Sequence, residues 1–514
     1  MTMNLRLIFI LLLITPALVW AQTQTTYNKL EYYIGNYPGA GNVIRSAAAY
    51  DSTVILVVIG SDSLTYYKMQ VVQTDMQGNK LHAVDFANDT IAWVPYPGSS
   101  IIIDSDSNIV IATNNWHTNT NFWDGVLVKL DKNLDTLWTK IISIPDSISG
   151  CTNVSNNHTI FMVIKETKNK NYIIGGRYFI DCLYQFSNER SFLLKVDKNG
   201  NIIWWRAYTN VRNVFDLDIT SDSCFVFNDA FAGYYINKYD QNGNFIWKVK
   251  PNDLIHLLSR NIKTKDEYII SASPHRYDEV QGISIYGIDV TKLSLSGDIF
   301  WNKQYIPFRS FKTMDLHHHF QIEILPNDDI LISGTGWVIN EDSTKAGYKG
   351  IMLRLNSQGD SLWCRAYNIG DFSYDCQFND LVLMDDGGFL AVGKHLPFYT
   401  GGIMAGWLVR TDSMGVAPGA LTLDVKTLAH ESLKFTVYPN PASDFVNIRL
   451  SELHNHTLVA GLYNALGQRL FYTPIDIMQQ EIKIDVSSYD TGIYFLVLSD
   501  GSSIVGSVRL VVAR

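Results

Sequence analysis

The stretch from Lys195 to Trp204, Lys-Val-Asp-Lys-Asn-Gly-Asn-Ile-Ile-Trp, holds a phrase that occurs seven times in this chain of 514 residues. An acidic or small polar anchor is followed three places later by Gly and seven places later by Trp. The anchors stand 43 to 66 residues apart, at Asp75, Asp131, Asp197, Asp240, Ser294, Asn356 and Asp412. A phrase that returns at such intervals indicates a repeat architecture.

The Gly and the Trp differ little between the copies. Gly is missing only from the second copy, where we expect Asn133 to take the left-handed turn position. The Trp residues, predicted to have a structural role in the repeat, are Trp138, Trp204, Trp247, Trp301 and Trp363. The first copy has His82 in that place and the last has Gly419.

Apolar runs stand on both sides of the phrase, as in 192–196 and 202–205. Two such runs joined by Asp-x-x-Gly predict a β-hairpin, because Asp bonds back to the turn and Gly supplies a positive φ. The large apolar Trp is expected to lie between neighbouring sheets. An earlier strand pair with a polar turn, such as Asp386 to Gly393, precedes each phrase and brings each unit to about four strands.

The predicted fold is all-β: a seven-bladed β-propeller over residues 29–415, followed by a small C-terminal β-sandwich. The seventh unit stops at Val416-Ala417-Pro418-Gly419, without a Trp strand. The stretch Tyr32-Tyr33-Ile34-Gly35 is similar to Tyr367-Asn368-Ile369-Gly370 at the end of the sixth copy. We therefore expect residues 29–35 to complete the last blade, since an incomplete blade leaves an exposed edge. Residues 416–431 are expected to form an aperiodic linker.

Composition narrows the class of partner and the compartment. A net charge of −9 without a basic patch argues against a nucleic-acid partner. Residues 1–21 have the pattern of a secretory signal, with cleavage expected between Ala21 and Gln22. A membrane anchor is the alternative, but the apolar stretch is short and is broken by Pro16. No later run is long enough for a transmembrane segment in the mature chain.

Five cysteines leave at least one thiol unpaired. In an exported chain, Cys151 could pair with Cys182 and Cys364 with Cys376. Buried free thiols are the alternative. No Cys or His spacing indicates a zinc site.

The phrase Asp-x-x-Gly-x-x-x-Trp resembles the tryptophan-docking repeat of quinoprotein dehydrogenase propellers. Those enzymes usually have eight repeats, and many have adjacent cysteines near the cofactor. This chain has seven copies of the phrase and no adjacent cysteines. The resemblance therefore implies a similar blade geometry rather than similar chemistry, and no cofactor is predicted.

The pattern changes in residues 432–514, where alternating apolar residues and short turns predict a small, immunoglobulin-like β-sandwich. This region resembles the type A sorting domain of the type IX secretion system. The matching motif residues are Tyr438, Pro439, Asn440, Pro441, Gly467, Gly492 and Tyr494. The resemblance implies export, with the type IX machinery as partner. It also implies removal of the tail, with release of the protein or its attachment to surface lipopolysaccharide.

Three groups of residues could carry chemistry, and each has a plainer explanation. His317, His318 and His319 are consecutive, so a strand would point them to opposite faces. The run Asp104-x-Asp106-x-Asn108 is similar to the start of a calcium loop but continues into a strand at Ile109. The pairs Asp328-Asp329 and Asp385-Asp386 occupy the same turn of their repeats. No catalytic, cofactor-binding or metal-binding residue is therefore predicted.

These observations favour a secreted or surface-attached binding or scaffold protein whose ligand is a glycan or another protein. The alternative is a hydrolase or lyase that acts on polysaccharide or peptide at one propeller face. Carboxylates that converge in a central channel would favour the enzyme. A plugged channel would favour a third interpretation, a structural protein without a small ligand. Fold alone does not decide among them.

Overall fold

The computed structural model describes most of the chain, and the regular structure of the described residues consists of β-strands. No helix in this part of the chain is long and apolar enough to cross a membrane. The described residues are 25–34, 42–60, 68–87, 90–144, 154–182, 190–208, 214–229, 235–251, 261–280, 283–307, 320–339, 345–397, 404–423, 425–429, 435–450, 458–464, 469–475, 481–499 and 504–513.

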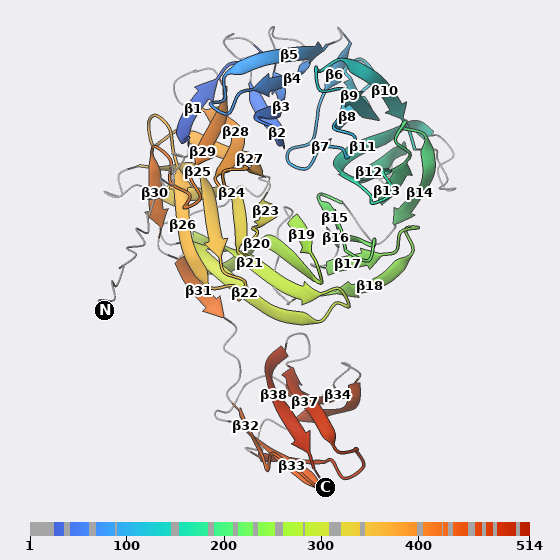
Figure 1. Ribbon diagram of the computed structural model, residues 1–514, viewed down its shortest axis with the longest axis vertical. Coiled ribbons are helices and arrows are strands. Elements are labelled where there is room, and N and C mark those ends of the chain that lie inside the picture. Colours follow the sequence, from blue (N-terminus) through green and yellow to red (C-terminus); the bar gives the residue numbers. More distant parts are fainter. Residues whose placement is uncertain are drawn as a thin grey trace, which may run out of the picture.

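Seven of the nine sheets in the described residues surround a common centre (Figure 1). In chain order, the first four contain β2 (Val43–Tyr50), β3 (Thr53–Gly60), β4 (Lys68–Thr74) and β5 (Lys80–Phe86); β6 (Ile91–Trp93), β7 (Ile101–Ile103), β8 (Ile109–His117), β9 (Phe122–Leu130) and β10 (Thr136–Ile142); β11 (Val154–Glu166), β12 (Tyr172–Cys182), β13 (Arg190–Val196) and β14 (Ile202–Tyr208); and β15 (Leu217–Ile219), β16 (Phe225–Asp229), β17 (Tyr235–Tyr239) and β18 (Phe245–Val249).

The other three sheets of the ring also include strands from the two ends of this region. They contain β19 (Asn261–Lys265), β20 (Tyr268–Val280), β21 (Ile283–Ser294), β22 (Ile299–Pro307) and β31 (Val425–Ala429); β23 (Gln321–Ile324), β24 (Ile330–Ile339), β25 (Ala346–Leu355), β26 (Ser361–Tyr367) and β30 (Ala420–Leu423); and β27 (Asp375–Leu383), β28 (Phe389–Leu396), β29 (Ala405–Thr411) and β1 (Tyr27–Glu31).

In the first six copies the repeated phrase forms the hairpin turn between two neighbouring antiparallel strands, as between β13 and β14. In the seventh copy the turn at Asp412 follows β29 and leads toward β30, which belongs to another sheet. In the clearest copy, Asp197 Oδ1 accepts the backbone amides of Asn199 and Asn201 at 2.9 and 2.8 Å, and Gly200 has a φ of 78°. The second copy differs from our expectation, because Leu134 and not Asn133 has the positive φ, 66°. Leu134 stands where the other copies have Gly, and its side chain is buried at 2% exposure. Packing of an apolar side chain therefore replaces the conformational freedom of Gly at this turn.

Each Trp of the phrase lies against the Gly of the following copy, in the neighbouring sheet. A Cβ atom added to these glycines would lie 2.5 to 3.3 Å from the nearest Trp ring atom. The pairs are Trp138 with Gly200, Trp204 with Gly243, Trp247 with Gly297, Trp301 with Gly359 and Trp363 with Gly415. Gly therefore serves two purposes here, a positive φ in its own turn and a close approach by the neighbouring ring.

The two roles can be tested separately, because one glycine has only the positive φ and another has both the positive φ and the Trp contact. Gly415 has a φ of 73° and lies against Trp363, whereas Gly387 has a φ of 78° and only the Ser413 Cβ at 4.0 Å. We expect Gly387→Ala to lower the free energy of unfolding by about 1 kcal/mol. Gly415→Ala should lower it by about 3 kcal/mol, because Trp363 must also move. Urea unfolding of both variants measures the difference; equal losses would contradict the docking role.

The N-terminal strand β1 pairs with β29, so the sheet of 375–411 takes its fourth strand from the other end of the chain. Tyr27 stands opposite Arg410, as Trp363 stands opposite Arg354. Tyr27 also lies against Gly78 of the first copy. Tyr27 thus occupies the place of the Trp that the seventh copy lacks. The strand begins two residues before the predicted start at Lys29, and Gly35 lies outside the described residues.

The segment expected to be an aperiodic linker instead contains strands. β30 pairs with β26 and β31 pairs with β22, so each adds a fifth strand to the outer edge of a sheet. Leu423 is buried at 6% exposure among the residues between these two sheets. The prediction failed because the segment is too short to show a period of its own, and the edge that it pairs with lies far away in sequence.

The remaining two sheets belong to the C-terminal region and share one apolar core. They contain β32 (Phe435–Tyr438), β33 (Phe445–Leu450) and β36 (Glu481–Asp485); and β34 (Leu458–Asn464), β35 (Arg469–Ile475), β37 (Gly492–Ser499) and β38 (Ile504–Val512). The Asn440 side chain joins the two sheets, because its Nδ2 donates to the Arg509 carbonyl at 2.7 Å and its Oδ1 accepts the Val511 amide at 2.8 Å.

The pairing considered for Cys364 and Cys376 is wrong, since both thiols are free and buried. They lie in separate apolar clusters, Cys364 with the core between two sheets and Cys376 with the core of the next pair. Cys151 and the side chain of Cys182 lie outside the described part of the structure.

Candidate functional site

The innermost strands of the seven sheets, β2, β7, β11, β15, β19, β23 and β27, line the centre of the ring (Figure 1). Four of these strands carry a charged residue at one shared level of the sequence pattern. The level is two residues before the turn that follows each strand. In ring order its residues are Ala48, Ile102, Lys165, Asp218, Lys263, Glu323 and Val382. Charges of alternating sign therefore occupy four consecutive sheets, and the other three contribute apolar side chains.

Lys263 is the hub of this charged arc. Its Nζ lies 3.0 Å from Glu323, and the two side chains are 28% and 24% exposed. Burial disfavours the ammonium, but the carboxylates of Glu323 and Asp218 outweigh burial and raise the pKa of Lys263 above its ordinary value. The lysine therefore remains charged between its acidic neighbours.

The carboxylates of the central channel also bond the backbone of the following sheet. Asp216 accepts the Ile262 amide at 3.1 Å, and Asp218 accepts the Thr264 amide at 2.7 Å. Asp380 accepts the Ala47 amide at 2.9 Å. These carboxylates satisfy amides that would otherwise be unpaired between adjacent sheets, which is a structural use.

Burial raises the pKa of both Asp216 and Asp380. Burial raises the pKa of Asp380 to about 7, although the amides of Ala47 and Leu381 act in the opposite direction. Glu323 adds to the rise and Lys165 opposes it. Charges from two other sheets and backbone amides of two sheets therefore act on this one carboxyl group.

This perturbation predicts a pH dependence of stability. Unfolded Asp ionises near pH 4. Because its pKa is higher in the folded protein, Asp380 contributes stability below pH 4 that is lost as the pH rises through about 7. The wild type should therefore lose a few kcal/mol, on the order of 3, between pH 4 and pH 8 relative to Asp380→Asn. Urea unfolding of both proteins across this range gives the difference, and parallel profiles would contradict it.

A segment from the second sheet, residues 94–100, crosses the centre of the ring; we call it the plug. Its Gly98 donates its amide to the Arg45 carbonyl at 2.9 Å, and its Ser99 carbonyl accepts the Ile164 amide at 3.0 Å. A side chain at Gly98 would collide with the Gln321 amide and approach the Asn379 carbonyl.

The plug also reaches a sheet on the far side, because the rings of Tyr96 and Phe215 lie 6.1 Å apart. Including its own sheet, it contacts six of the seven sheets of the ring. The channel is therefore filled at this level by the chain itself.

The candidate residues from the sequence take part in turns and ion pairs. Asp104 bonds the Lys129 ammonium at 2.8 Å and the Tyr172 hydroxyl at 2.8 Å. Asp328 pairs with Lys265 at 2.6 Å, and Asp386 pairs with Arg410. The described residues contain no group of three or more His, Cys, Asp or Glu side chains that could hold a metal ion. His317, His318, His319, Ala21, Gln22 and Gly467 lie outside the described residues.

Sequence reasoning missed a position that stands two residues before each anchor. It holds Gln73, Lys129, Lys195, Lys238, Lys292, Arg354 and Arg410. Arg354 shows its use: it bonds Asp329 in its own sheet at 2.7 Å and the Ser413 carbonyl in the next sheet at 2.8 Å. Lys238 similarly bonds Asp222 at 2.7 Å and the Leu295 carbonyl at 2.9 Å. Lys or Arg stands at this position in six of the seven copies, and this regularity in the sequence could have predicted a shared contact.

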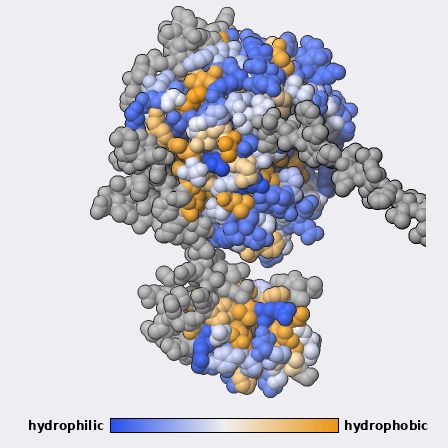
Figure 2. Space-filling view, turned by 60° about the vertical axis from the view of Figure 1, so that its left-hand side comes forward, coloured by the Kyte–Doolittle hydropathy of each residue, from blue (hydrophilic) through white to orange (hydrophobic). Residues whose placement is uncertain are grey.

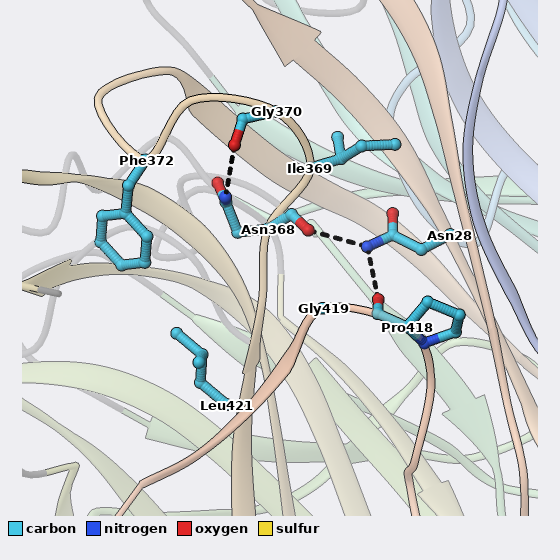
Figure 3. Close-up of a pocket in the computed structure, with 8 residues that line it drawn as sticks. All are labelled: Asn28, Asn368, Ile369, Gly370, Phe372, Pro418, Gly419 and Leu421. Atoms are coloured by element: carbon cyan, nitrogen blue, oxygen red, sulfur yellow. Dashed lines mark hydrogen bonds between the residues drawn. The ribbon is translucent and has the colours of Figure 1, made fainter. Parts of the chain in front are cut away.

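A pocket of about 440 Å³ opens at the rim of the ring, between β1 and β30 (Figure 3). Its residues are Asn28, Asn368, Ile369, Gly370, Phe372, Pro418, Gly419 and Leu421. Asn28 Nδ2 donates to the carbonyls of Asn368 and Pro418 at 2.8 Å each, and its Oδ1 accepts Trp407 Nε1 at 2.7 Å. With these bonds made, the walls that remain are largely apolar.

The C-terminal region has a recognisable family. Residues 436–513 match the secretion system C-terminal sorting domain. This match confirms the resemblance to the type IX sorting domain, and the chain is exported to the cell surface or secreted. The type IX machinery is therefore a partner of this chain.

The solved structures that are similar to this chain share little sequence with it. The WD40 domain of Neurospora crassa Pan2 is 9% identical, with a TM-score of 0.41, over 73% of this chain and 90% of that one. The β-propeller domain of the Trilobed protease from Pyrococcus furiosus is 9% identical, with a TM-score of 0.36, over 71% and 93%.

An α-L-arabinanase of Penicillium chrysogenum complexed with arabinobiose is 8% identical, with a TM-score of 0.39, over 76% of this chain and 99% of that one. No curated protein sequence matches this chain. The ring of sheets in the central region resembles a repeat β-propeller. Likenesses this distant assign no chemistry to the chain, which must be argued from its own residues.

Proposed function

We propose that this chain is an exported binding or scaffold protein: a seven-bladed β-propeller, with β1 completing the last blade, followed by an immunoglobulin-like sorting domain. The main support for a binding role rather than a catalytic one is the plug, because it occupies the part of the channel where a central catalytic site would lie. The channel carboxylates further support this proposal, since they accept backbone amides of the next sheet.

The proposed binding surface is the end of the ring opposite the repeated turns. The turns at the other end hold a repeating hydrogen-bond pattern, whereas the connections at this end differ in length from sheet to sheet. Aromatic pairs stand here: Trp116 and Trp123 are stacked with centroids 5.8 Å apart, and Trp337 meets Tyr348 edge-on at 5.0 Å. Such rings are suited to contact the faces of sugar rings or apolar side chains.

The test is retention of residues 22–429 on immobilised polysaccharides and peptidoglycan. We expect selective retention, and weaker retention for Trp116→Ala and Trp337→Ala. Leu137→Ala, which changes a residue 51% exposed on the outer strand β10, is the matched control and should behave as the wild type. Absence of retention on every surface, including immobilised candidate proteins, would sink the binding proposal.

The second candidate is a hydrolase or lyase that acts on polysaccharide or peptide. One observation favours it: burial raises the pKa of the Asp380 carboxyl to about 7, and Glu323 and Lys165 act on this carboxyl from two other sheets. Shortening of a retained ligand, abolished by Glu323→Gln, would favour the enzyme. An unchanged chain length of the retained ligand would leave the binding role.

A further inference from the structure

The rim pocket is shaped for an apolar group rather than a polar one. Figure 3 shows Phe372 and Leu421 pointing toward one another across it, whereas the Ile369 side chain points away from both. The Asn28 amide, its most polar wall, already bonds two carbonyls and the Trp407 indole. A polar ligand would find few unpaired groups here, whereas one apolar side chain would be buried between Phe372 and Leu421.

The strand beside the pocket has a free edge. Within the described residues β30 is the last strand of its sheet, and only β26 pairs with it. Its four residues, Ala420 to Leu423, include neither a charge nor a proline, the usual protections of an exposed edge. Figure 2 brings this side of the ring forward and shows hydrophobic residues in separate patches among polar ones.

The same rim already accepts extended segments in two places. The chain lays β30 on the edge of β26 and β31 on the edge of β22, both antiparallel. In the first segment, Ala-Leu-Thr-Leu, Leu421 and Leu423 stand at alternate positions; the second, Val-Lys-Thr-Leu-Ala, has apolar residues at both of its ends. A strand from another protein could pair with the outer edge of β30 in the same way as β30 pairs with β26. One of its side chains could then enter the pocket that Leu421 lines.

We propose that the edge of β30 and the adjoining pocket form a strand-addition site for an extended segment of a partner protein. The segment has apolar residues at alternate positions, as Leu421 and Leu423 stand in β30. Its backbone pairs with β30, and one apolar side chain enters the pocket between Phe372 and Leu421. Backbone pairing supplies affinity in this mode of recognition, and the pocket supplies specificity. The site is independent of the polysaccharide-binding surface proposed above.

The probe is a fluorescently labelled synthetic peptide with the sequence of residues 420–429, because this rim already pairs with that sequence. Its binding to residues 22–429 is followed by fluorescence anisotropy. Phe372→Asp removes the apolar wall and places a carboxylate near the Lys349 ammonium, which lies 4.7 Å from the Phe372 ring centroid. We expect this variant to bind the peptide about tenfold more weakly or worse. Leu137→Asp, on the distant strand β10, is the matched control and should bind as the wild type.

Hydrogen exchange gives a second readout that does not depend on a variant. Peptide addition should slow exchange of amides in residues 420–423. Faster exchange there would mean that the peptide displaces β30, and protection confined to β5, β10, β14 or β18 would place the site on another edge; either result overturns the proposal. So does the absence of binding, or equal binding by Phe372→Asp and the wild type.

Discussion

A chain that begins at Gly39 is expected to unfold many degrees below one that begins at Gln22, with a loss of about 4 to 6 kcal/mol in the free energy of unfolding. The truncation removes the five residues of β1 and their ladder with β29. It also removes Asn28, the partner of the buried Trp407 indole, and Tyr27, which lies against Gly78. An edge of the ring and a buried donor would both lose their partners.

The control for this truncation begins at Thr25, which retains every residue of β1 and should melt with the wild type. Asn28→Ala isolates the side chain and should cost about 2 kcal/mol, chiefly from the unpaired Trp407 N–H. Thermal and urea unfolding measure all three proteins. If the Gly39 chain melts with the wild type, β1 does not stabilise the ring.

The second large effect concerns the C-terminal strands. Chains that end at Ala429 and at Gly419 both lack the sorting domain, but only the first keeps β30 and β31. The shorter chain should lose about 3 to 5 kcal/mol, because two outer ladders disappear and the buried side chain of Leu423 is removed from the core between two sheets. The bond of Arg365 to the Thr422 hydroxyl at 2.9 Å is lost as well.

The matched variant for this pair is Leu423→Ala in the chain that ends at Ala429. It should cost about 2 to 3 kcal/mol if burial of this side chain carries a large share of the effect. Urea unfolding midpoints compare the three chains. Equal midpoints for the two lengths would show that 420–429 is the passive linker that the sequence suggested.

The repeat was readable because it depends on local chemistry. Asp197, Gly200 and Trp204 stand at fixed offsets, and a turn that needs a positive φ and an Asx bond leaves that trace in any single copy. The exception was Leu134, where burial and not backbone freedom decided the turn. The sorting domain was readable for a similar reason, since its motifs lie in one short stretch of the chain.

The contents of the channel were not readable in the same way. Gly98, Asp216 and Asp380 belong to different sheets, and no interval between them in the chain indicates that they meet. Their burial shifts the pKa of Asp380, but burial is a property of the assembled ring. The same holds for the rim pocket, which forms only where residues 28, 368–372 and 418–421 come together.

By itself, the sequence determined the all-β class, the repeat with its turns, and the export route, because each depends on residues close together in the chain. The tertiary structure alone decided that the plug fills the channel, that the channel carboxylates accept backbone amides, and that 420–429 forms strands on the rim. Those outcomes depend on strand edges and cavities that form only when segments far apart in the chain pack together. A local sequence pattern does not show which distant segments will meet.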